Sequence, residues 1–218
     1  MDEVPREILQ AAYRRKPIYI LKIPVLYGMW AGVLAVLYAT QTSPYAVPIG
    51  VACSLLVAYV IRGLGAIAHD AVHGTVAKGK LASYLLAWLC WMPTGMSVTI
   101  YSNYHLHHHK IANTYPDVDN FVVTDYTRNP FFAKVLLFAV YTVGYPIYFL
   151  LCMFRFYVKR LTPMKRVRMN LEVAVWAALV ALCYWQMPHR VFFFFYGLPF
   201  LMGAFLASLT SMIEHYEM

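Results

Sequence analysis

Histidines gather at two places in the sequence, and both places adjoin long apolar stretches. His69 and His73 are four residues apart, and four more histidines lie within residues 105–109. Residues four apart share one face of a helix. Neutral imidazole is the commonest metal ligand among side chains, and histidine beside lipid is costly, so its presence suggests a function. The two groups together predict a metal site at the ends of membrane helices.

Spacing within the second group selects three of its members as ligands. His105, His108 and His109 are separated by steps of three and four, so a helix presents them on one face. His107 projects from roughly the opposite side, at about 100° per residue, and we expect it to stay outside the site. With the first pair, this gives more nitrogen ligands than one tetrahedral zinc takes. All-nitrogen ligation suits zinc, copper, iron or nickel, and two adjacent ions would use all five of these ligands.

The residue that follows the first histidine of the first pair argues against a zinc peptidase. Zinc peptidases usually carry a glutamate there, within an HExxH motif, and use it as the general base. In this chain the position is Asp70, and no glutamate lies between His69 and His73. The sequence therefore gives little support to peptidase chemistry.

Composition places these histidines in a membrane protein. The chain has 218 residues, of which 61% are hydrophobic and 13% are charged, whereas a soluble domain carries about 25% charged residues. The net charge of +8 comes from Lys and Arg that lie between apolar stretches, as in cytoplasmic loops of membrane proteins. We therefore expect a membrane as partner and no nucleic acid. The length suits one membrane-embedded domain, residues 1–218.

Six apolar segments approach the length of about 20 residues that a membrane-spanning helix needs. They are 24–40, 46–68, 82–100, 131–154, 171–187 and 191–212. If 82–100 were a single crossing, the two histidine groups would lie on opposite sides of the membrane and could not share a metal. Pro93 and Gly95 interrupt this segment, which favours a re-entrant or interfacial helix.

The segment 131–154 is flanked by polar or basic sequence on both sides and contains Pro146. We expect it to lie on the membrane or dip into it, with a hairpin as the alternative. The other four segments are then transmembrane helices. The basic N-terminal arm should lie in the cytoplasm, which leaves only His189 on the outer face. The sequence thus predicts an all-α, multi-pass integral membrane protein with four transmembrane helices, and with re-entrant or interfacial helices that carry the histidines on the cytoplasmic side.

With these motifs the chain resembles the membrane fatty-acid desaturase and hydroxylase superfamily, whose members bind two irons through histidine boxes. The motif HDAVHG at 69–74 is similar to the first box, and HLHHH at 105–109 is similar to the second. NTYPDVD at 113–119 resembles the polar stretch after that box, and SMIEH at 211–215 resembles an additional histidine after the last helix. The implied metal ligands are His69, His73, His105, His108, His109 and His215.

Groups that hydrogen-bond to metal ligands orient them and are part of a metal site. The candidates for this role are Asp70, Asn113, Asp117, Asp119 and Glu214. The resemblance implies two iron ions, molecular oxygen as co-substrate, and two electrons from a carrier such as ferredoxin or a b-type cytochrome. It also implies a lipid or acyl substrate that enters from the bilayer.

The activity that the resemblance implies is desaturation, which introduces a double bond into a fatty-acyl chain. A carotenoid ketolase or hydroxylase is the alternative within the superfamily, because the motif at 69–74 also resembles the first box of that branch. A membrane metal transporter would hold its ligands near the bilayer midplane. The segments 24–40 and 46–60 contain almost no polar residues, which argues against that class.

Superfamily members carry a third histidine box beyond the last membrane helix, and residues 1–218 contain no such motif. We therefore expect the full protein to continue beyond Met218 with a further HxxHH motif. We expect residues 1–218 alone to bind metal incompletely and to show little or no activity. A non-catalytic membrane metal-binding fragment is the remaining alternative.

Overall fold

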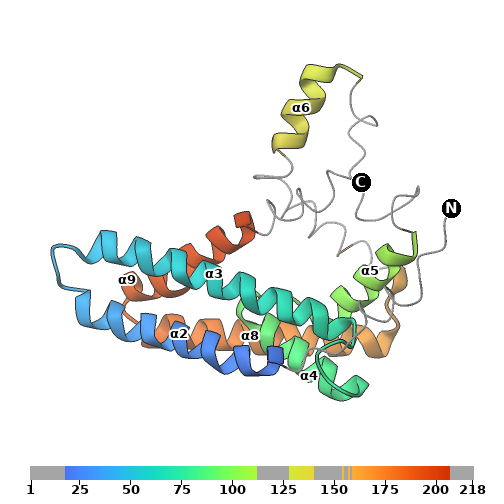
Figure 1. The fold of residues 1–218 in the computed structure, drawn as a ribbon, viewed down its shortest axis with the longest axis horizontal. Coiled ribbons are helices and arrows are strands. Elements are labelled where there is room, and N and C mark those ends of the chain that lie inside the picture. Colours follow the sequence, from blue (N-terminus) through green and yellow to red (C-terminus); the bar gives the residue numbers. More distant parts are fainter. Residues whose placement is uncertain (1–17, 112–127, 140–153, 155–156, 158, 207–218) are drawn as a thin grey trace.

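The structure, a computed structural model, describes residues 18–111, 128–139, 154, 157 and 159–206. Every regular element within these residues is a helix, in the order α2, α3, α4, η1, α5, α6, α8, α9 and η4. Figure 1 shows α2, α3 and α8 lying along the long axis of the molecule, with α5 near one end. The predicted all-helical architecture is confirmed.

The first two helices form an antiparallel pair joined by a short turn. α2 (Ile18–Thr40) and α3 (Ala46–Val72) are both strongly apolar, and Figure 1 shows them side by side. Val33 of α2 and Val57 and Leu64 of α3 are buried in one shared core. α3 extends four residues beyond the predicted 46–68, so the first histidine pair lies at the end of a membrane-length helix.

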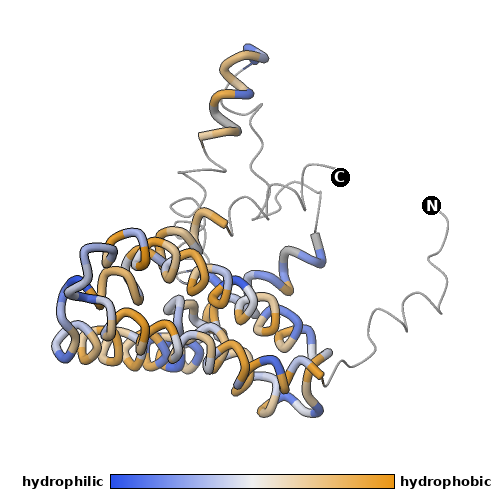
Figure 2. The backbone as a smooth tube through the Cα atoms, turned by 60° about the vertical axis from the view of Figure 1, so that its left-hand side comes forward, coloured by the Kyte–Doolittle hydropathy of each residue, from blue (hydrophilic) through white to orange (hydrophobic). Residues whose placement is uncertain are grey.

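Within the described residues, four helices are long and apolar enough to cross a membrane. They are Ile18–Thr40, Ala46–Val72, Pro163–Gln186 and His189–Leu206. Figure 2 shows apolar residues along the whole length of the bundle helices. Large apolar side chains point outward from them, among them Leu171 at 61% exposure and Trp185 at 84%. A surface of this kind suits lipid tails rather than water, and the number of candidate spans is the number predicted.

A sharp elbow, residues 92–97, separates the next two helices. α4 (Lys80–Trp91) runs into the short helix η1 (Met92–Thr94), and α5 (Val98–Ile111) leaves the elbow at an angle of 106° to them. Pro93 lies inside η1 and Gly95 follows it with φ +69°, a conformation that glycine adopts without steric cost. The predicted break of segment 82–100 at these two residues is confirmed.

The last span contains a turn of π-helix. α9 (His189–Phe192) leads into η4 (Phe193–Gly197). Ser54 donates a hydrogen bond to the Phe194 carbonyl at 2.8 Å, and Trp30 donates one to the Phe195 carbonyl at 3.3 Å. Backbone groups that leave the regular helical pattern in a membrane need such partners. The Phe194 ring packs against Gly50, where a Cβ atom would lie 2.6 Å from it.

The helix α8 (Pro163–Gln186) begins eight residues before the predicted segment 171–187. Thr162 is its N-cap and Pro163 its first residue, a combination that favours a helix start. The basic residues Lys165, Arg166 and Arg168 therefore lie in the first turns of this helix. The predicted start of this segment at residue 171 was therefore too late, because the charges of these residues concealed the capping signal just before them.

The predicted interfacial segment 131–154 is described only in part. Its beginning forms α6 (Pro130–Ala139), which stands away from the bundle in Figure 1. Residues 140–153 lie outside the described residues. The placement of the whole segment at the membrane surface therefore stays a prediction, as does the cytoplasmic side of the histidines.

Candidate metal centre

The first histidine pair is held in place by the way α3 ends. His73 is the C-cap of the helix, and Gly74 follows it with φ +73°. The Gly74 N–H donates to the Ala71 carbonyl at 3.0 Å, and the Thr75 N–H donates to the Asp70 carbonyl at 3.2 Å. These two bonds form a Schellman motif, which closes a helix and favours glycine at the left-handed position. The motif fixes the backbone that carries the pair.

The second pair comes from α5. His105 and His109 are one helical turn apart, and the elbow aims this part of α5 at the end of α3. Tyr101 stacks against the His105 ring with centroids 4.9 Å apart, and it also packs against Trp91 at 4.1 Å. His105 itself is buried. Aromatic packing on one side therefore restricts the His105 ring to the orientation that faces the other imidazoles.

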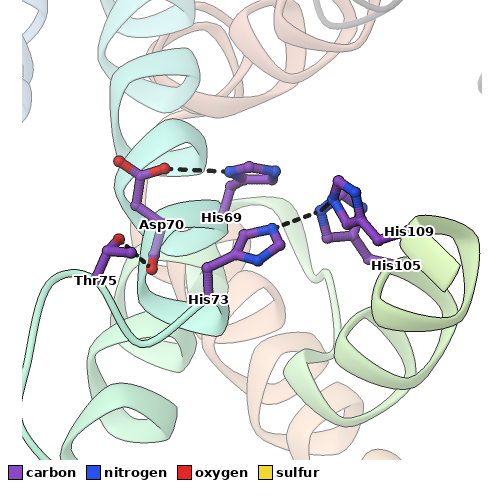
Figure 3. A network of polar contacts seen from close by, with 6 residues as sticks. All are labelled: His69, Asp70, His73, Thr75, His105 and His109. Atoms are coloured by element: carbon purple, nitrogen blue, oxygen red, sulfur yellow. Dashed lines mark hydrogen bonds and ion pairs between the residues drawn. The ribbon is translucent and has the colours of Figure 1, made fainter. Parts of the chain in front are cut away.

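The two pairs converge on one point, although they lie in separate stretches of the chain. Ligand nitrogens of His69, His73, His105 and His109 all lie within 4.8 Å of one another; we call these four residues the histidine centre. The Nε2 atoms of His73 and His105 are 3.0 Å apart, and those of His105 and His109 are 2.9 Å apart. Figure 3 shows the four rings turned toward a common point between the two helices.

These nitrogen separations fit a bound metal ion. A neutral imidazole nitrogen carries either one hydrogen or one lone pair, so His105 Nε2 cannot accept a hydrogen bond from both neighbours. Two nitrogens that bind one ion at right angles with bonds of about 2.1 Å lie about 3.0 Å apart. A cation bound between these nitrogens would remove this conflict, and the donor set suits iron, zinc, copper or nickel.

The surroundings of His73 favour its neutral, ligating form. Burial lowers the pKa of His73, and the neighbouring His69 and His109 lower it further. Asp70 Oδ1 lies 3.3 Å from His69 Nδ1. Because a carboxylate only accepts, this contact assigns the hydrogen to Nδ1 and leaves the Nε2 lone pair for a metal. This contact is compatible with the orienting role predicted for Asp70, which stays a prediction.

The structure does not describe the side chains of the other predicted site residues. The side chain of His108 and the residues Asn113, Asp117, Asp119, Glu214 and His215 lie outside the described part of the chain. Their roles stay predictions. His107, which was expected to stay out of the site, is not a member of the histidine centre among the described residues.

Similarity to a known protein family identifies the family of this chain. A family profile described as "Fatty acid desaturase" matches residues 45–218, which include α3, both histidine groups and the last two spans. This chain belongs to the fatty acid desaturase family. No curated protein sequence matches the chain. The family and the histidine centre agree with each other, because residues that the motifs singled out from sequence lie together in space.

This member of the desaturase family also contains a buried acid that the sequence reasoning missed. Glu172 of α8 is only 7% exposed and accepts hydrogen bonds from Tyr84, Ser97 and Thr99. The available signal was a lone carboxylate inside an apolar segment. Glu172 is the second residue of the predicted segment 171–187, and no role was predicted for it from the sequence.

Proposed function

We propose that this protein is an oxygen-dependent lipid desaturase that introduces a double bond into a fatty-acyl chain at a histidine-ligated di-iron centre. The convergence of four imidazoles from α3 and α5 carries the proposal, and membership of the desaturase family supplies the reaction class. When bound, the irons would activate molecular oxygen so that hydrogen is removed from an unactivated C–H bond.

The histidine centre would supply four of the iron ligands. We propose that His108 and His215 add further ligands, as the family motifs imply. Asp70 holds His69 in the ligating orientation through the 3.3 Å contact. We propose orienting roles at the same centre for Asn113, Asp117, Asp119 and Glu214.

The position of the centre along the helices favours an enzyme over a transporter. His69 lies in the last turn of α3 and His73 is its C-cap, whereas transporters hold substrates near the bilayer midplane. A centre at a helix end can receive an acyl chain from the lipid and electrons from the aqueous side. We place this side in the cytoplasm, where basic residues such as Lys165 and Arg168 would attract an acidic ferredoxin or b-type cytochrome.

Product analysis tests the proposal and separates it from its nearest alternative. The full-length protein would be produced in a host that makes both saturated acyl lipids and carotenoids, with His105→Ala as the inactive control. We expect new double bonds in acyl chains only with the wild-type protein. Oxygenated carotenoids would instead assign the ketolase or hydroxylase branch. An unchanged lipid and carotenoid profile, with iron bound by the protein, would contradict a catalytic role on either substrate.

A further inference from the structure

Glu172 places a carboxylate inside α8, one of the four candidate membrane spans. Burial of an ionised group is costly unless hydrogen bonds replace its hydration. Acidic residues within membrane helices are rare and usually mark a function. Glu172 is not a member of the histidine centre, so metal ligation does not account for its burial.

Four donors surround the Glu172 carboxylate, and both of its oxygens accept. Oε1 accepts from the Tyr84 hydroxyl at 2.5 Å and from the Thr99 hydroxyl at 2.5 Å. Oε2 accepts from the Ser97 hydroxyl and from the Thr99 backbone N–H at 3.2 Å. Three of these donors belong to the residues at which α5 starts.

The contacts make Glu172 a cap for α5 that is supplied by another helix. Ser97 caps the same end locally, because its side-chain oxygen accepts from the Ile100 N–H at 3.3 Å and its carbonyl accepts from the Tyr101 N–H at 3.0 Å. The first N–H groups of a helix have no partner within the helix, and a negative charge there interacts favourably with the helix dipole. Glu172, which is 73 residues from Thr99 in the sequence, supplies that charge.

The position of α5 decides whether the histidine centre can form. His105 follows Thr99 by six residues, which is about 9 Å along a helix at 1.5 Å per residue. A tilt of about 10° at the capped end would therefore move His105 by roughly 1.6 Å, more than the tolerance of about 0.5 Å typical of functional sites. The Nε2 atoms of His105 and His73 are only 3.0 Å apart, so such a tilt would separate the two pairs.

Other contacts from α8 brace the same region. Lys165 donates a hydrogen bond to Asn103 Oδ1 at 2.6 Å, in the middle of α5. Trp176 packs against Gly95 in the elbow, where a Cβ atom would lie 2.6 Å from the indole ring. Glu172 lies between these two residues along α8, at the point where α5 begins. α8 therefore contacts the elbow, the start of α5 and its middle.

We propose that Glu172 is a positioning residue for the metal centre: it holds the N-terminus of α5, and through it His105 and His109, in register with the pair on α3. This inference rests on the proposed binding of metal by the histidine centre. It concerns the geometry of the ligands and assigns no chemical step to Glu172.

Metal titration of the full-length protein tests the inference, with cobalt(II) as the probe because its visible absorption reports ligand geometry. The variants are Glu172→Gln, Thr99→Val and the double variant. Leu171→Ala, at an adjacent residue that is 61% exposed, is the matched control. We expect Glu172→Gln to weaken cobalt(II) binding roughly 10-fold and to alter the visible absorption spectrum, as substitutions of residues that orient metal ligands do. Thr99→Val should add little in the double variant, because the two residues act through one contact.

A second measurement separates positioning from general destabilisation. In the metal-free protein, Glu172→Gln should accelerate amide hydrogen exchange in residues 98–105 and leave α2 and α3 unchanged. Equal acceleration throughout the protein would overturn the positioning role. Equal cobalt(II) binding by wild type and Glu172→Gln would also overturn it and leave the proposed function standing. A wild-type protein that binds no cobalt(II) would overturn both, since there would be no centre to position.

Discussion

The two histidine pairs meet at one point but are held by different means. The pair on α3 depends on its own neighbourhood, because Gly74 closes the helix directly after His73. The pair on α5 depends on distant residues, because the helix that carries it is capped by Glu172 of α8. Local sequence therefore sets one half of the centre, and tertiary packing sets the other. Disturbance of the two halves should have different consequences.

Removal of His105, the α5 imidazole that contacts the half on α3, should have the largest effect. His105 Nε2 lies 3.0 Å from the Nε2 atom of His73 and 2.9 Å from that of His109. We expect His105→Ala to abolish metal binding and product formation, measured by metal analysis and lipid chromatography. His107→Ala is the control and should retain both. A loss of metal in His107→Ala as severe as in His105→Ala would contradict the assignment of ligands by helical face.

A methyl group at the elbow should disrupt the half that depends on tertiary packing. Gly95→Ala introduces a Cβ atom 2.6 Å from Trp176 at φ +69°, so it combines overpacking with backbone strain. We expect it to destabilise the protein by about 3 kcal/mol and to reduce metal affinity, as measured by denaturant unfolding and titration. Unchanged stability would show that α8 does not fix the elbow.

The same change at the end of α3 should be milder. Gly74 has φ +73° but nothing within 4 Å of the position that a Cβ atom would take. Gly74→Ala should therefore cost about 1 kcal/mol, from backbone strain alone, with a modest loss of metal affinity as His73 shifts. Gly28→Ala is the matched control: its Cβ atom would also meet nothing within 4 Å, in a helix without a positive φ. A loss in Gly28→Ala equal to that in Gly74→Ala would refute the role of the Schellman motif.

The smallest effect should be a dependence of stability on pH in the metal-free protein. Burial lowers the pKa of His73 in the folded state, so the unfolded chain takes up the proton first. The contribution of neutral His73 to the free energy of unfolding is then fully present above the pKa of histidine in the unfolded chain, about 6.5. This contribution decreases as the pH falls through that value. Melting temperatures from pH 8 to pH 5 should fall less for His73→Gln than for the wild type. Parallel curves would exclude this contribution.

Sequence reasoning predicted those features whose causes lie within a few residues. The spacing of His69 and His73, the breaking effect of Pro93 and Gly95, and the apolar lengths of four helices all have local signals. The early start of α8 also had one, in Thr162 and Pro163, but the charges that follow obscured it.

Two features had no local signal. The π-helical turn at Phe193–Gly197 accompanies the packing of Phe194 onto Gly50, from a helix far earlier in the chain. The cap on α5 requires Glu172 to meet Ser97 and Thr99, at separations of 75 and 73 residues. Periodicity and motif spacing contain no information on which distant residues will meet, so both features emerge only from the folded structure.

The cap supplied by Glu172 also sets an order for biogenesis. A ribosome that adds about 5–20 residues per second delivers Glu172 some 4–15 seconds after Thr99, since 73 residues separate them. During that interval α5 has been synthesised but lacks the carboxylate that anchors it. The histidine centre can therefore take its final geometry only after α8, the third candidate span, has been synthesised.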